Sequence, residues 1–382
     1  MADLRPFRGV RYQTRGAGDA DALVSPPYDV IPDDDLELYR SRSPYNVVRL
    51  IRPGQDYEGA SAAFQAWLAE GVLSEDAQPS LYVHEVAFDG LTRRDLMGAL
   101  RLEDYEDKVV LPHELTHRGP KEDRLALLRA TGVAMEPLWL LYDAAGSPLP
   151  GLVREAAAGP PDLEFEGADG RHRLWVVGDT SMHRQVAAAL AGAPLLIADG
   201  HHRYETALLH SKEVAGGADA ASRFTLALLT ALDDPGLKVL PTHRVMRTGV
   251  RLTGGEPAGS LEEVLGSIKG KVAAGHYAAG AYQVVPLEGE VAVVELHRQV
   301  IDNILAGRPA EETLLYTRDG PEAVRWVDGG RGVAAFFLDA PDLRQVLDLA
   351  RRGTTMPQKS TYFHPKPPSG MVFMRIGPDL RL

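Results

Sequence analysis

Apolar and polar residues alternate with two different periods in the middle of the chain. Short apolar runs at 174–177, 195–198 and 224–232 have the length and composition of buried strands. Between them, 182–190 and 202–215 carry apolar residues at the spacing of amphipathic helices. Strands that alternate with helices in this way favour an α/β or α+β arrangement, with helices packed on a mixed sheet.

The flanking regions carry similar patterns. Ala60, Phe64, Trp67 and Leu68 predict a helix over 57–70 that ends at Gly71. The remaining patterns predict strands at 81–86, 99–102 and 333–338, and helices at 121–131, 296–305 and 341–351. Residues 253–260 and the Gly- and Ala-rich stretch 270–281 are expected to be loops, and prolines predict an irregular tail over 356–370.

Composition excludes several classes of protein. The 382 residues include no Cys, which rules out disulfides, thiol nucleophiles, iron–sulfur clusters and Cys-ligated zinc. The formal net charge of −12 gives no general attraction to nucleic acid or to an anionic bilayer. No apolar run reaches the length of roughly 20 residues that spans a membrane. We therefore expect a cytoplasmic protein with no nucleic-acid or membrane partner, whose oligomeric state the sequence leaves open.

The strongest chemical signal is the string Asp199-Gly200-His201-His202-Arg203, which follows the apolar run 195–198 and opens the next helix. The first turn of a helix offers backbone N–H groups and the positive end of the helix dipole, and an arginine there can grip a phosphate with two N–H groups. The string therefore predicts a phosphate cradle. The alternative is an Asp-Gly turn followed by two surface histidines. Neither a Walker P-loop nor a G-x-G-x-x-G string occurs.

A second signal is Pro112-His113-Glu114-Leu115-Thr116-His117, which matches the zinc-peptidase string H-E-x-x-H. That chemistry needs both histidines on one face of a continuous helix. Pro112 and Gly119-Pro120 leave room for about one and a half helical turns, which is poor support for a metal site. The alternative is the polar entry to a capped helix that begins near Lys121.

Two further segments carry candidate residues. Asp29 follows Pro26-Pro27-Tyr28, so it lies on a rigid, non-helical segment that suits either a positioned base or an ordinary turn. Lys359, Ser360 and Thr361 lie in the proline-rich tail, where they suit either a phosphate or carboxylate site or a basic surface.

Taken in order, these motifs resemble a large, mostly uncharacterised prokaryotic family of conserved-domain proteins. The Asp-Gly-His-His-Arg string also resembles the nucleotide-binding motif of the free serine kinases, which belong with sulfiredoxin and the ParB nucleotidase-like domain. This resemblance implies an α+β (mixed α/β) fold with a ParB/sulfiredoxin-like core formed by 1–50 and 171–250. It implies an inserted α/β segment at 51–170, and a C-terminal α/β segment at 251–382 whose tail contacts substrate or phosphate.

The resemblance also implies roles for individual residues. Gly200, His201, His202 and Arg203 would contact the phosphates of ATP or ADP, and Asp199 would shape the loop or help to hold Mg²⁺. Asp29 matches the glutamate of a Pro-x-Glu segment that is proposed to activate the acceptor hydroxyl, with His201 and Arg203 as its catalytic partners. Lys359-Ser360-Thr361 is similar to a Pro-Lys-Thr-Thr segment that would clamp the substrate.

The implied function is a nucleotide-dependent kinase that phosphorylates a small hydroxylated metabolite, an amino acid such as free L-serine. Asp29 is one methylene shorter than glutamate, and 170 residues separate it from Asp199, so the acceptor pocket is expected to differ from that of the compact kinases. A nucleotide-gated regulatory protein without kinase activity is the main alternative. A zinc hydrolase that uses His113, Glu114 and His117 is the lesser one.

Overall fold

The computed structural model describes residues 1–13, 18–114, 119–214, 216–249, 252, 254–305, 307 and 309–382. Two compact units make up the chain. The larger unit contains Met1–Pro112, Thr116–Leu237 and Pro365–Leu382, and the smaller unit contains His113–Leu115 and Lys238–His364. The larger unit is therefore assembled from three separate stretches of sequence.

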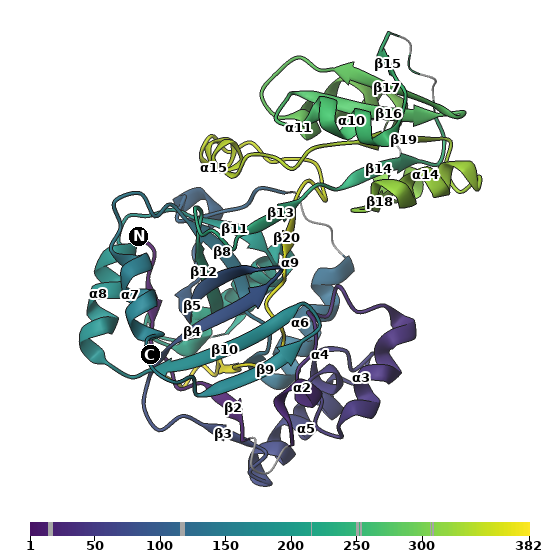
Figure 1. Cartoon of the computed structure of the whole chain (residues 1–382). Coiled ribbons are helices and arrows are strands. Elements are labelled where there is room, and N and C mark those ends of the chain that lie inside the picture. Colours follow the sequence, from purple (N-terminus) through teal and green to yellow (C-terminus); the bar gives the residue numbers. More distant parts are fainter. Residues whose placement is uncertain are drawn as a thin grey trace. The chain divides into compact units, whose positions relative to one another are not determined.

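A mixed sheet forms the centre of the larger unit (Figure 1). Its strands run in the order β6 (Val110–Leu111), β11 (Leu195–Asp199), β8 (Leu138–Tyr142), β12 (Phe224–Ala231), β5 (Leu91–Arg101), β4 (Leu81–Phe88), β10 (Gly170–Val177) and β9 (Leu163–Gly167), with β1 (Leu4–Arg5) also paired to β5. β12 is parallel to β8 and antiparallel to β5. Every residue of β8 and β12 is buried, as their mainly apolar composition predicts for central strands.

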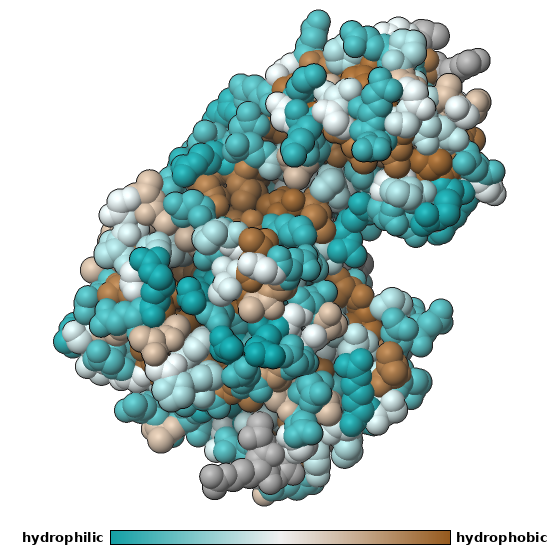
Figure 2. Space-filling view, in the orientation of Figure 1, coloured by the Kyte–Doolittle hydropathy of each residue, from teal (hydrophilic) through white to brown (hydrophobic). Residues whose placement is uncertain are grey.

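Helices pack against this sheet and share one apolar core with it. Leu149 and Val153 of α7 (Leu149–Ala156), Val186 of α8 (Thr180–Leu190) and Tyr204 of α9 (His201–Glu213) join sheet residues in a single buried cluster. α6 (Gly119–Thr131) packs against α9. Hydrophilic side chains cover most of the face that Figure 2 shows, as expected when the apolar residues of these elements are buried.

A second apolar cluster holds the N-terminal helices of the larger unit. Phe64 and Trp67 of α5 (Tyr57–Ala69) pack with Phe373 from the C-terminal segment. Asp56 caps α5, because its carboxylate accepts a hydrogen bond from the N–H of Gly59 at 2.9 Å. The remaining elements of this unit are β2 (Val10–Tyr12), α2 (Ala20–Leu23), η1 (Asp33–Asp35), α3 (Leu36–Arg42), α4 (Val48–Ile51), β3 (Leu73–Glu75), η2 (Tyr105–Asp107), β7 (Val133–Ala134), η3 (Ala221–Arg223) and β21 (Met374–Arg375).

The smaller unit contains an antiparallel sheet of six strands (Figure 1). Their order is β15 (Glu256–Ala258), β17 (Ala281–Pro286), β16 (Ala273–Ala278), β19 (Ala334–Phe337), β14 (His243–Met246) and β18 (Leu314–Thr317). The other elements are β13 (Lys238–Leu240) paired with β20 (Tyr362–His364), α10 (Leu261–Ile268), α11 (Ala292–Leu296), the π-helical turn η4 (His297–Ile301), α12 (Asp302–Leu305), α13 (Ala310–Thr313), α14 (Gly320–Asp328) and α15 (Leu343–Arg351).

The mixed α/β class predicted from the sequence is confirmed, and so are most of the predicted elements, α5 and β11 among them. The loops predicted at 253–260 and 270–281 are wrong in part, because β15, β16 and the start of β17 lie there. Residues 51–112 and 119–170 belong to the same compact unit as 18–50 and 171–237. That 51–170 is an insertion into a ParB/sulfiredoxin-like core stays a prediction. None of the described helices has the length and apolar character needed to cross a membrane.

Candidate functional site

The predicted turn at Gly200 is present, and it requires glycine. Gly200 caps α9 with φ +98°, in the left-handed region that other residues rarely adopt. A Cβ atom at this position would lie 3.1 Å from both Arg203 Nη2 and Leu138 Cδ2. The backbone therefore turns sharply between Asp199, which ends β11, and Arg203 in the first turn of α9.

Lys366 brings Asp29 and Asp199 together. Its Nζ lies 2.7 Å from Asp29 Oδ2 and 2.6 Å from Asp199 Oδ1, although 170 residues separate the two aspartates. The Lys366 side chain is 10% exposed and that of Asp199 16%, whereas the Asp29 side chain is 40% exposed. Burial acts to lower the pKa of Lys366, but the two carboxylates outweigh it and raise that pKa well above the usual value for lysine.

Arg203 fixes Asp199 from the opposite side. Its Nη2 donates to Asp199 Oδ2 at 2.5 Å, and its Nη1 donates to the carbonyl oxygen of Pro137 at 2.5 Å. Asp199 therefore lies between two cations, Lys366 and Arg203. The guanidinium of Arg203 thus also contacts Asp199 and the Pro137 carbonyl, and its predicted contact with a phosphate stays a prediction.

The loop that carries Asp29 is held by residues from distant segments. Glu136 Oε1 accepts hydrogen bonds from the N–H of Tyr28 and from Ser369 Oγ, both at 2.9 Å. The guanidinium of Arg124 lies 4.2 Å from the centre of the Tyr28 ring, and Arg52 donates to the Tyr28 carbonyl at 2.8 Å. Burial raises the pKa of Tyr28 to about 12, so this phenol stays neutral at physiological pH.

A fully buried arginine supports the residue before Lys366. Arg93 Nη1 donates to the carbonyl oxygen of Pro365 at 2.7 Å, and Arg93 Nε donates to Asp95 Oδ1 at 2.9 Å. The Arg93 guanidinium also stacks 4.1 Å from the centre of the Trp139 ring. The Arg93 and Asp95 side chains are both 0% exposed. Lys366 therefore follows a backbone position that the core of the larger unit holds in place.

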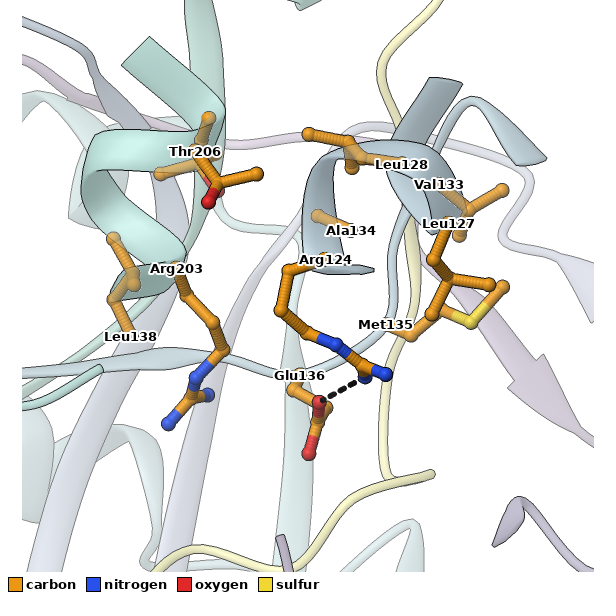
Figure 3. Close-up of a pocket in the computed structure, with 12 residues that line it drawn as sticks. Arg124, Leu127, Leu128, Val133, Ala134, Met135, Glu136, Leu138, Arg203 and Thr206 are labelled. Carbon is orange, nitrogen blue, oxygen red and sulfur yellow. Dashed lines mark ion pairs between the residues drawn. The ribbon is translucent and has the colours of Figure 1, made fainter. Parts of the chain in front are cut away.

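A cavity of about 60 Å³ lies beside this site, between α6 and α9 (Figure 3). Its walls are mainly apolar and include Leu127, Leu128, Val133, Leu138 and Ala207. At one end, Glu136 lies between the guanidinium groups of Arg124 and Arg203. Arg203 and Glu136 thus belong to both the cavity and the charged site, since Arg203 binds Asp199 and Glu136 binds the N–H of Tyr28.

Of the other predicted phosphate contacts, His201 and His202 lie half-buried in the first turn of α9. Lys359, Ser360 and Thr361 belong to the smaller unit, where their backbone N–H groups donate to the Glu114 carboxylate at 3.0, 2.8 and 3.3 Å. Within the larger unit, it is Lys366 of the same tail that meets the two aspartates. The role of Lys359–Thr361 as a substrate clamp stays a prediction.

The zinc-peptidase geometry is not formed by the described part of its motif. His113 and Glu114 lie in an extended segment in which Glu114 bridges to Met356, and α6 begins only at Gly119. His113 Nε2 lies 2.9 Å from Thr361 Oγ1. His117 lies outside the described residues. Within the described ranges, no group of three or more His, Cys, Asp or Glu side chains is placed to hold a metal ion.

Asp29 and Asp199 also fit poorly as Mg²⁺ ligands. Two carboxylates could bridge a divalent cation, but here the Lys366 ammonium lies between them and provides the positive charge. The predicted help of Asp199 in holding Mg²⁺ is therefore not supported by this arrangement.

Comparison with protein families gives one decisive match. The model of the family described as "Protein of unknown function (DUF1015)" matches residues 4–320. The chain belongs to this family. The match covers Asp29, Asp199 and Arg203, and it ends before Lys366. The ParB/sulfiredoxin superfamily that the sequence resembles is not shown by this match. No curated protein matches this DUF1015 chain.

Solved structures give distant matches to the DUF1015 chain. A conserved hypothetical protein from Pyrococcus furiosus is 20% identical, with 69% of this chain and 90% of that chain covered and a TM-score of 0.38. A variant of a free serine kinase in complex with AMP is 16% identical, with 77% and 95% covered and a TM-score of 0.42. SbnI with a C-terminal truncation from Staphylococcus aureus is 11% identical, with 71% and 84% covered and a TM-score of 0.35. TM-scores below 0.5 do not establish that this chain shares the fold of these proteins.

Three of the residues that build the site were not predicted to take part in it: Lys366, Glu136 and Arg93. Lys366 is one of two lysines in the proline-rich tail, and the resemblance pointed to the other. Glu136 lies within an otherwise apolar stretch at 133–142, whereas Arg93 lies in the polar first half of β5. A charged residue in a buried strand needs a partner, and that is the signal that could have identified Arg93.

Proposed function

We propose that this protein is a nucleotide-dependent small-molecule kinase that transfers a phosphoryl group from ATP or ADP to the hydroxyl of an amino acid such as free L-serine. The observation that carries the proposal is the pair of ion contacts from Lys366 to Asp29 and Asp199 at the start of α9. It supports the idea that the resemblance to the free serine kinase motifs reflects one shared site, because segments far apart in sequence converge there.

In this proposal the start of α9, from Gly200 to Arg203, receives the donor phosphates. The positive end of the helix dipole favours negative charge at that position, and Lys366 and Arg203 add two cations. Phosphoryl transfer requires little covalent help from the protein, so positioning and charge neutralisation are the main contributions of these residues.

Asp29 is proposed to orient the acceptor and take its proton. It is the more exposed of the two aspartates, and the ion pair with Arg203 is made by Asp199 in addition to the contact with Lys366 that both share. Donor phosphates would compete with Asp29 for the Lys366 ammonium and release its carboxylate for the acceptor. The acceptor oxygen then forms a bond to phosphorus as its proton passes to Asp29, while the bond from phosphorus to the nucleotide oxygen breaks.

Product analysis tests the proposal. The purified full chain is incubated with ATP or with ADP, with and without Mg²⁺, and with a panel of hydroxylated amino acids, and products are followed by phosphorus NMR. We expect a phosphomonoester from at least one acceptor, and its loss in Asp29→Asn. Asp34→Asn, on an exposed part of the same loop region, is the matched control and should retain activity.

Two outcomes would contradict the kinase. One is nucleotide binding without any phosphorylated product across the panel, which would favour the nucleotide-gated regulatory alternative. The other is full activity in Asp29→Asn.

A further inference from the structure

We infer that the cavity between α6 and α9 binds a short, mainly aliphatic part of the acceptor that carries one hydrogen-bonding atom. This inference rests on the proposed function for the identity of the acceptor. It assigns a specificity pocket to the site and implies that the preferred acceptor is larger than serine.

The first argument is the character of the cavity walls. Leu127, Val133, Leu138 and Ala207 are buried apolar residues of four different elements, and their side chains leave about 60 Å³ unfilled. The space is half open, and a concave, mainly apolar wall with a few polar groups is typical of small-molecule sites. An apolar wall also favours a hydrocarbon group over water, which needs two to four polar partners.

The second argument is an unsatisfied hydroxyl. Thr206 lies one helical turn after Arg203 on α9, lines the cavity and is only 3% exposed. Its Oγ1 has no hydrogen-bond partner in the described part of the chain. Buried polar groups are nearly always hydrogen-bonded in native proteins. This hydroxyl is therefore evidence for a ligand atom that would form the missing hydrogen bond.

The third argument is that two residues of the cavity wall also belong to the charged site (Figure 3). Glu136 lies in this wall, and its carboxylate binds the N–H of Tyr28, which directly precedes Asp29. Arg203 also lies there, bound to Asp199. A group in the cavity would therefore be attached to a molecule that reaches the proposed base.

Size decides which part of the reactants fits. A cavity of 60 Å³ has room for about four to six non-hydrogen atoms, if each occupies about the 10–15 Å³ that a water molecule needs. A purine base is about twice that size. The cavity therefore suits a short acceptor side chain and does not suit the nucleobase of the donor.

A series of β-hydroxy amino acids tests the inference. In L-serine, L-threonine, β-hydroxynorvaline and β-hydroxynorleucine, the alkyl chain beyond the hydroxyl-bearing carbon lengthens by one carbon at each step. Their affinities for the full chain are measured by calorimetry in the presence of ADP. We expect the dissociation constant to fall about fourfold for each added methylene until the cavity is full. An analogue of β-hydroxynorvaline with a terminal hydroxyl should bind more tightly than its parent to the wild type, and should lose that advantage in Thr206→Val.

Variants that fill the cavity provide the control. Ala207→Leu should abolish the dependence on chain length, and Ala207→Val is a milder substitution in case the larger side chain disturbs folding. Leu209→Ala, at an exposed position of the same helix, should leave the dependence unchanged. Equal affinities across the series in the wild type, or an unaltered dependence in both Ala207 variants, would overturn the inference.

The same measurements separate this inference from the kinase itself. Affinity that rises with chain length, without any phosphorylated product, would support the cavity and refute the kinase. Turnover of serine with no dependence on chain length would support the kinase and refute the cavity.

Discussion

Arg93 Nη1 donates a hydrogen bond to the carbonyl oxygen of Pro365 at 2.7 Å, from a side chain that no solvent reaches. This contact joins β5 of the central sheet to the residue that precedes Lys366. The same guanidinium binds Asp95, which is also hydrogen-bonded to His84 through Oδ2 and accepts a hydrogen bond from Thr230 at Oδ1. The position of the site lysine therefore depends on a buried polar network in the core of the larger unit.

Substitution of Arg93 should affect both stability and the site. In Arg93→Met, Asp95 stays buried without its main counter-charge, so we expect the free energy of unfolding to fall by about 3–5 kcal/mol. Affinity for ADP should also fall. It is measured without denaturant, at a temperature at which the variant is folded. Arg171→Ala is the matched control, since Arg171 pairs with Glu166 at the surface of β10 and should cost less than about 1 kcal/mol. Unchanged urea unfolding in Arg93→Met would contradict the role assigned to the network.

Removal of Lys366 should destabilise the protein in a pH-dependent way. Lys366→Met removes the ammonium group that Asp29 and Asp199 share and should cost about 3 kcal/mol at neutral pH. The pKa of Lys366 is raised in the folded state, so the stabilisation is complete below the unfolded-state pKa of about 10.4 and is lost as the pH rises towards the folded-state value. Urea unfolding of both proteins from pH 7 to 11 checks this, with Lys212→Met on the surface of α9 as the control. A stability difference that is constant up to pH 11 would be inconsistent with the raised pKa.

Mild acid should destabilise the larger unit through His172. This side chain lies against His84, with Nδ1 3.0 Å from His84 Nε2, and burial lowers its pKa to about 2. The unfolded chain takes up a proton near pH 6.5 while the folded chain does not, so stability falls as the pH drops below that value. His172→Gln should reduce the slope of unfolding free energy against pH by about 1.4 kcal/mol per unit between pH 6 and 4. Identical slopes for the variant and the wild type would show that His172 is protonated in the fold.

Gly200→Ala should reduce stability and ADP affinity more than Gly192→Ala, whose position has open space for a side chain. Gly200 and Gly192 both have positive φ, +98° and +85°, so both substitutions strain the backbone by about 1–3 kcal/mol. A Cβ at Gly192 meets nothing within 4 Å, whereas one at Gly200 crowds Arg203 and Leu138. We therefore expect Gly200→Ala to unfold at lower denaturant concentration than Gly192→Ala and to bind ADP more weakly. If both variants unfolded at the same denaturant concentration and bound ADP equally well, Gly200 would have no special role in the site.

Local sequence determined much of this structure, and its limits are physical. The helix at 57–69 follows from one apolar face with a capping aspartate, and the turn at Gly200 follows from an apolar strand that stops at Asp-Gly. The β16–β17 hairpin was missed because Ala and Gly have low strand propensity, and its pairing with β19 is a tertiary contact. His113 and Glu114 match a helical motif, but pairing with Met356 holds that segment extended.

The choice between Lys359 and Lys366 shows the same limit at the candidate site. Both lysines lie in one irregular, proline-rich tail, and no periodicity assigns either of them to a face. The identity of the lysine that meets Asp29 and Asp199 depends on where the chain returns to the larger unit, at Pro365. Long-range placement of that kind has no signature in a single sequence.

The return of the chain at Pro365 has a consequence for biosynthesis. The larger unit lacks its last stretch, including the partner of β7, until 365–382 has been made. Before then Asp29 lacks its ammonium partner and Asp199 has only Arg203, so a nascent or prematurely terminated chain would present a more negative site than the finished protein. The protein would thus become able to bind its ligand only after the smaller unit and the segment 365–382 have been translated.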